Sequence, residues 1–213
     1  MDVLPFNIWY YIVGMAGIAV FSITGVMAGA KKGMDIMGIV IIGLVTALGG
    51  GTIRDIILDV PVFWVDNYLD IAVALAASII AFFFVEYLWK TYKPLLTLDG
   101  LGVALFNVQA IDKTLAFGFS PAIAVIMGLI TGITGGVIRD LLTGRPTLII
   151  RQELYATPIL IGGVFYVAWL WLLPGEILGG FLAIAIVVLI RIAAIRWNLR
   201  YPERLLYSGR EDP

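Results

Sequence analysis

Two short stretches place glycines and an arginine–aspartate pair inside apolar segments long enough to cross a membrane. The first is residues 49–55 (GGGTIRD) and the second is residues 135–140 (GGVIRD). A charged arginine at the centre of a bilayer costs about 3 kcal/mol even on the mildest insertion scales. Each arginine is therefore expected to face protein, water or a solute rather than lipid.

The glycines are candidates for an ion path. Glycine is a poor helix former, so consecutive glycines in the middle of a membrane helix are expected to kink or unwind it. Unwinding would free carbonyl groups, which together with hydroxyls can replace the water shell of a cation. The candidate residues for the path are Thr46, Gly49, Gly50, Gly51, Thr131, Thr134, Gly135 and Gly136. The alternative is that the glycines only let two crossing helices touch.

The charged residues of both stretches, Arg54, Asp55, Arg139 and Asp140, are interpreted as structural or gating charges. Neighbouring residues on a helix point about 100° apart, so an adjacent pair is not expected to neutralise itself. Each arginine is expected to bind freed carbonyls or an acidic residue of the other half of the chain.

The two stretches belong to a longer repeat with a constant offset of 85 residues. Gly17 and Phe21 match Gly102 and Phe106, and matches continue through the glycine and Arg-Asp positions to Pro61 and Pro146. Ungapped identities over this length indicate duplication of a three-helix unit. Because three is an odd number of crossings, the second copy must enter the membrane from the opposite face. This predicts an inverted repeat, whose symmetry axis commonly passes through a transport site.

Composition places the chain in a membrane. Hydrophobic residues make up 61% and charged residues 14% of the 213 residues, against roughly a quarter charged in an average soluble domain. Cysteine and histidine are absent, which argues against thiol, histidine or zinc chemistry. We expect no enzyme activity, no cofactor, no metal beyond transient potassium or sodium, and no nucleic-acid partner.

Runs of about 20 apolar residues mark membrane helices. They predict an all-α protein with seven spans over residues 7–30, 36–58, 68–92, 97–112, 119–143, 153–173 and 176–197. A single membrane domain covers residues 1–197, with repeat one at about 7–92, repeat two at about 95–173 and an extra helix at about 176–197. Residues 198–213 form a tail.

Lysine and arginine gather on one side of this topology, which by the positive-inside rule is the cytoplasm. These residues are Lys31, Lys32, Lys90, Lys93, Arg145, Arg151, Arg196, Arg200, Arg204 and Arg210. The opposite side receives Asp112 and Lys113, among others. The amino terminus is predicted outside and the carboxyl terminus in the cytoplasm of a multi-pass plasma or inner membrane protein. The basic tail is expected to contact anionic lipid head groups.

Both repeated motifs, with residues 61–64 (PVFW) after the first, resemble the prokaryotic trimeric intracellular cation channels, a family also labelled as glycine-transporter-like. The resemblance spans residues 10–197. It implies a seven-helix protomer, a homotrimer, and a potassium-permeable pore through each protomer that passes the glycines of the second and fifth helices.

Two functions remain open from the residues themselves. In a monovalent cation channel, the glycine breaks and threonine hydroxyls bind potassium. In a secondary transporter of a small amino acid such as glycine, the substrate carboxylate is bound by Arg54, by Arg139 or by the amino end of a half-helix. A scaffold or lipid-binding protein is a third, weaker alternative.

Overall fold

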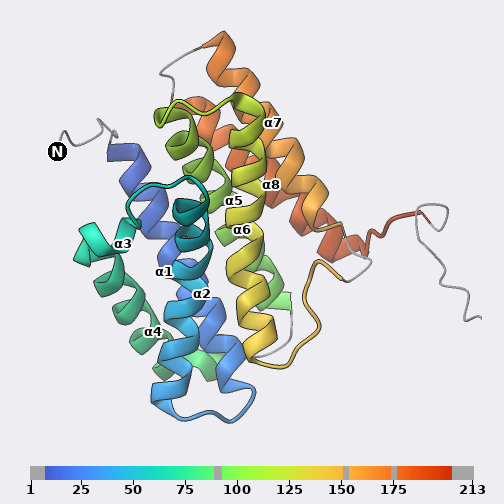
Figure 1. Cartoon of the computed structure of the whole chain (residues 1–213). Coiled ribbons are helices and arrows are strands. Elements are labelled where there is room, and N and C mark those ends of the chain that lie inside the picture. The colour runs from blue at the N-terminus through green and yellow to red at the C-terminus, as the bar shows by residue number, and fades with distance from the viewer. Residues whose placement is uncertain (1–7, 89–92, 151–153, 174–176, 203–213) are drawn as a thin grey trace, which may run out of the picture.

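The computed structural model describes residues 8–88, 93–150, 154–173 and 177–202. It is built from helices, coloured along the chain in Figure 1. Their bounds are α1 Ile8–Ala30, α2 Ile36–Ile57, α3 Phe63–Asp66, α4 Tyr68–Leu88, α5 Lys93–Ala116, α6 Pro121–Leu142, α7 Ala156–Leu172 and α8 Leu178–Trp197. The predicted helix limits at residues 7, 89–92, 153 and 176, the basic residues Lys90, Arg151, Arg204 and Arg210, and the tail beyond residue 202 lie outside the described residues.

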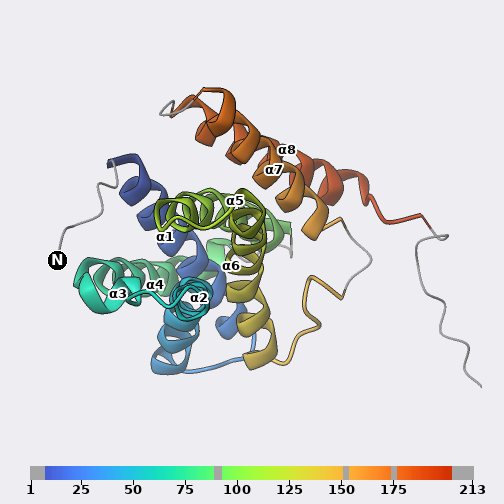
Figure 2. The ribbon, with the colours of Figure 1, turned by 45° about the horizontal axis from the view of Figure 1, so that its top comes forward.

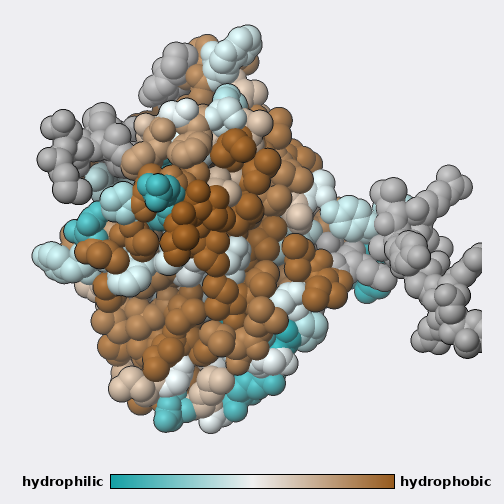
Figure 3. Space-filling view, viewed as in Figure 1, coloured by the Kyte–Doolittle hydropathy of each residue, from teal (hydrophilic) through white to brown (hydrophobic). Residues whose placement is uncertain are grey.

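Six of these helices are long and apolar enough to cross a membrane, and α7 is an apolar helix of 17 residues. At 1.5 Å per residue α7 is about 25 Å long, slightly less than the hydrocarbon core of a bilayer. Figure 3 shows one face of the molecule as mostly hydrophobic, with hydrophilic residues gathered toward its ends. The predicted all-α membrane fold is confirmed, and the short helix α3 was not predicted.

Helix α5 is longer than the predicted 97–112, since it begins at Lys93 and ends at Ala116. Pro94 does not limit this helix, because it occupies the first turn, where the missing amide hydrogen costs nothing. Polar side chains of α5 are shielded, since Asn107 is fully buried and Gln109 nearly so. Among the six candidate spans, α5 is the most completely buried.

Equivalent helices of the two repeats have matching limits. Helix α6 begins and ends 85 residues after α2 does. Each helix also has a capping residue at the equivalent position: Asp35 accepts from the amide of Gly38, and Ser120 accepts from the amide of Ile123. In Figure 1, α2 runs upward and α6 downward, and α1 and α5 also run in opposite directions. An inverted repeat requires this arrangement. The side of the membrane that each end faces stays a prediction.

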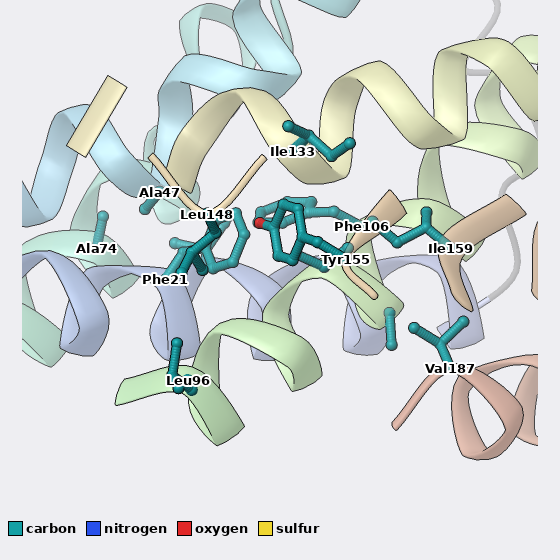
Figure 4. Close-up of a cluster of buried hydrophobic side chains, with 13 residues drawn as sticks. Phe21, Ala47, Ala74, Leu96, Phe106, Ile133, Leu148, Tyr155, Ile159 and Val187 are labelled. Carbon is teal, nitrogen blue, oxygen red and sulfur yellow. The ribbon is translucent and has the colours of Figure 1, made fainter. Parts of the chain in front are cut away.

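Reciprocal contacts join the halves in the core. A side chain at Gly17 would meet the ring of Phe106, and one at the equivalent Gly102 would meet the ring of the equivalent Phe21. The two rings lie 5.2 Å apart, centroid to centroid, and both belong to the main hydrophobic cluster in Figure 4. Contacts that exchange partners in this way are the pattern that a twofold relation produces. Figure 2 shows α7 and α8 paired on one side of α5.

Candidate functional site

The glycines of the two motifs lie where α2 crosses α6. A Cβ atom on Gly50 would clash with the backbone oxygen of Thr131, and one on Gly135 would clash with the backbone oxygen of Thr46. These are again reciprocal contacts between equivalent residues. Because the neighbours are backbone atoms, which cannot rotate away, only glycine fits at these two positions.

The predicted unwinding of the helices at the glycines was wrong. Helix α2 continues through residues 49–51, and α6 continues through residues 134–136. Glycine lowers helix stability in water, where a released backbone group can bond to solvent instead. Inside a membrane no such partner exists, so intrahelical hydrogen bonding wins. For Gly50 and Gly135, the structure favours the alternative interpretation, close packing of crossing helices.

The remaining glycines of the motifs face different neighbours. Gly49 faces the flexible end of the Ile138 side chain, and Gly51 faces the ring of Phe63. Gly136, which is equivalent to Gly51, faces the carboxylate of Asp99. The two copies therefore differ in what occupies the space beside the last glycine.

Two of the three threonines of the candidate path, Thr46 and Thr134, hydrogen-bond within their own helices. The hydroxyl of Thr46 donates to the carbonyl of Ile42 over 2.6 Å, and that of Thr134 donates to Ile130 over 2.6 Å. Thr131 is fully buried, and its hydroxyl has no hydrogen-bond partner among the described residues. The structure thus places Thr46 and Thr131 at the crossing of the two helices rather than on an open surface.

Arg139 lies at the centre of a buried polar cluster. Its Nη1 atom donates to Asp99 Oδ1 over 2.7 Å and to the hydroxyl of Thr24 over 3.1 Å, and its Nε atom donates to Asp140 over 2.9 Å. Tyr155 donates to the other oxygen of Asp99 over 3.0 Å. Arg139, Asp99 and Thr24 are fully buried. This guanidinium is therefore compensated inside protein, as its depth in the membrane requires.

Arg54 occupies the equivalent place in the first copy but has different neighbours. Its Nε atom donates to Asp55 Oδ1 over 2.8 Å, and Lys113 of α5 donates to the same oxygen over 2.9 Å. The second oxygen of Asp55 accepts from the backbone amide of Phe63 over 3.0 Å. Asp55 thus joins α2, α5 and α3 at one point.

The expectation that adjacent arginine and aspartate would not pair was wrong in both copies. The angle of about 100° separates the Cα–Cβ directions of neighbouring residues, but the arginine stem has enough rotatable bonds to bring Nε back to the neighbouring carboxylate. The expected partners, freed carbonyls or an acidic residue of the other half, are not among the contacts that the described residues give Arg139. Arg139 contacts Thr24 of the first copy, whereas its second carboxylate, Asp99, comes from its own copy.

Four partners in these clusters were not predicted: Thr24, Asp99, Lys113 and Tyr155. Lys113 was expected in a connection outside the membrane, but it lies in the last turn of α5 and is only 5% exposed. The sequence contained a usable signal for Asp99, because an acidic residue in an apolar span requires a buried partner. Which arginine binds it could not be read from spacing, since the two residues lie on different helices.

Comparison with known proteins places this fold and motif in one family. A family model described as Glycine transporter matches residues 11–86 and again residues 96–171, one match in each repeat. The inner membrane protein YadS of Escherichia coli K12, described as UPF0126, is 40% identical over 196 residues, which cover 90% of this chain and 94% of YadS.

Solved structures agree. A trimeric intracellular cation (TRIC) channel orthologue from Rhodobacter sphaeroides superposes with a TM-score of 0.85 at 37% identity, covering 89% of this chain and 98% of the orthologue. A second TRIC cation channel, from a structural study of conductance, superposes with a TM-score of 0.80 at 32% identity and covers 93% of this chain and 98% of its own. The chain is a multi-pass membrane protein that belongs to the TRIC channel family, whose domain model is described as Glycine transporter.

Proposed function

We propose that the protein is a potassium-permeable monovalent cation channel that assembles as a homotrimer, with one ion path through each protomer. The observation that carries this proposal is the TM-score of 0.85 with a TRIC channel at 37% identity over 89% of the chain. The basic tail is proposed to bind anionic lipid.

We assign the path to the crossing of α2 and α6, at the eight glycines and threonines predicted from the sequence. A threonine hydroxyl that donates to its own helix, as Thr46 and Thr134 do, keeps its oxygen lone pairs available for a cation. The contact between Gly50 and Thr131 holds the helices together in this conformation. Conduction is therefore proposed to require a small separation or tilt of α2 against α6.

The arginines support a channel over an amino-acid transporter. Arg139 already binds two aspartates and a threonine while fully buried, so a substrate carboxylate at its remaining donor, Nη2, would lie beside two carboxylates that repel it. Arg54 is also engaged, because it binds Asp55, which Lys113 binds as well. An arginine exposed in a narrow cation path would repel the permeant ion, more strongly as the local dielectric falls. Arginines engaged with carboxylates avoid this repulsion.

The test is current recording from purified protein in a planar bilayer with a potassium chloride gradient. We expect discrete unitary steps that reverse near the potassium equilibrium potential, and native mass spectrometry of the same preparation should give a trimer. Uptake of radiolabelled glycine into proteoliposomes tests the alternative function, a glycine transporter, which the description of the family model suggests. Glycine-dependent flux without unitary current would contradict the channel assignment and support the transporter.

A further inference from the structure

The two aspartates of the repeated motif differ in the use of their second carboxylate oxygen. Asp55 and Asp140 are equivalent, both are buried, and both accept from the Nε atom of the preceding arginine. The Oδ2 atom of Asp55 also accepts from the amide of Phe63. The Oδ2 atom of Asp140 has no hydrogen-bond partner among the described residues.

Residues 61–66, which contain helix α3, are held onto α2 at several points in the first copy. Besides the Phe63 amide, the indole nitrogen of Trp64 donates to the hydroxyl of Thr52 over 2.9 Å. The ring of Phe63 fills the space beside Gly51, where a Cβ atom would lie 2.5 Å from the ring. The centroid of the Phe63 ring is 5.8 Å from Arg54 Cζ. Two hydrogen bonds and one ring thus close this segment over the end of the motif.

The described part of the equivalent segment in the second copy, residues 146–150, lacks these attachments. Leu148 replaces Phe63 and packs into the main core with only 3% exposure. Val137 replaces Thr52, so no hydroxyl is available at that position. The space beside Gly136 holds polar atoms of Asp99, Tyr155 and Arg139 instead of an aromatic ring.

We propose that residues 61–66 form an aromatic latch that holds the Arg54 end of the ion path closed, with Phe63 as the closing side chain and Asp55 and Thr52 as its attachment points. This rests on the proposed channel function. A buried carboxylate oxygen is normally hydrogen-bonded, and of the two aspartates only Asp55 has such a bond at Oδ2, from the amide of Phe63 at the start of α3. Opening at the Arg54 end therefore requires release of Phe63 and Trp64, whereas in the described part of the second copy no aromatic side chain is attached to Asp140 in this way.

The latch is tested with Thr52→Val, which keeps side-chain shape and removes the acceptor for Trp64, and with Phe63→Ala, which removes the ring but keeps the amide. The matched control is Thr97→Val. The Thr97 hydroxyl donates to the carbonyl of Lys93 in its own helix over 3.0 Å, as that of Thr52 donates to the carbonyl of Leu48 over 2.8 Å, and Thr97 lies outside the latch. We expect open probability to rise about threefold to tenfold in Thr52→Val, the factor that one hydrogen bond contributes. Unitary conductance and reversal potential should equal those of the unmodified protein and of the control.

Hydrogen exchange of residues 59–67, read by mass spectrometry, measures release of the latch without any current. Thr52→Val should speed exchange there and leave residues 144–150 unchanged. If the unmodified protein conducts but both latch variants open with its probability, the latch is refuted while the channel function stands. Unchanged exchange would refute the attachment itself. Absence of any unitary current from the unmodified protein would instead refute the proposed function on which the latch rests.

Discussion

The Arg54 and Arg139 sites contain the same local motif and differ in the charge that α5 adds to each. At the Arg54 site, Lys113 joins Asp55, so two cations share one directly bound carboxylate. At the Arg139 site, Asp99 joins Asp140, so one cation binds two carboxylates. Lys113 and Asp99 are equivalent to Ala28 and Gly14 in the first copy, which carry no charge. Duplication thus preserved the pair and left its environment free to diverge.

Helix α5 supplies both added charges. Asp99 and Lys113 are 14 residues apart, which corresponds to about 21 Å along a helix and nearly the same face. One buried helix therefore contacts the motif of each copy at opposite ends. The difference between the sites teaches that the motifs do not act alone, since each depends on a partner outside its own helix.

The comparison of the Arg54 and Arg139 sites depends most strongly on the two copies being inverted in the membrane. Lys31 and Ala116 are equivalent, exposed positions at the ends of α1 and α5. Because the chain has no cysteine, Lys31→Cys and Ala116→Cys give single-cysteine proteins. Each should be labelled by an impermeant maleimide from one side of the membrane only, and the two sides should be opposite. Labelling of both from the same side would contradict the inverted repeat.

The next largest effect is expected from removing the arginines. Arg139→Gln leaves Asp99 and Asp140 buried without their cation, and breaking a buried ion pair in this way costs about 3–5 kcal/mol. Arg54→Gln should cost less, because Lys113 still binds Asp55. Denaturant or thermal unfolding in detergent measures the difference.

The double variant Arg54→Gln with Lys113→Met supplies the control, since it removes both cations from Asp55. It should approach the loss seen for Arg139→Gln. Equal losses for the two single arginine variants would show that Lys113 does not compensate, and the contrast between the sites would fail.

The smallest effect concerns adjacent glycines of one motif. Gly50→Ala places a methyl group against the backbone of Thr131, and overpacking of this kind costs about 1–3 kcal/mol. Gly49→Ala meets only the flexible end of Ile138, at 2.8 Å, and should cost less than Gly50→Ala. Gly135→Ala should behave like Gly50→Ala, because its contact with Thr46 is the reciprocal one. The same unfolding assay ranks the three, and a Gly49→Ala loss as large as that of Gly50→Ala would contradict the packing interpretation.

Much of the fold was predictable because it depends on properties that single residues carry. The all-α membrane class follows from apolar length, and the limits of α2 and α6 follow from the repeat and from the capping residues Asp35 and Ser120. The close contact of α2 and α6 at Gly50 and Gly135 agrees with the alternative stated from the sequence, that the glycines let two crossing helices touch. The continuity of α2 and α6 through the glycines was not predictable from helix propensities. Those propensities are measured in water and do not describe a helix whose backbone has no solvent to bond with.

The sequence by itself determined that the chain crosses a membrane, that its unit is duplicated, and that two arginines must be buried, because hydrophobicity, identity and charge belong to the residues in order. Only the tertiary structure decided which groups compensate those arginines. Lys113 reaches Asp55 from 58 positions away, and Asp99 reaches Arg139 across 40. Such pairings depend on how helices cross, and a crossing is selected by the packing of whole faces rather than by the spacing of any one motif.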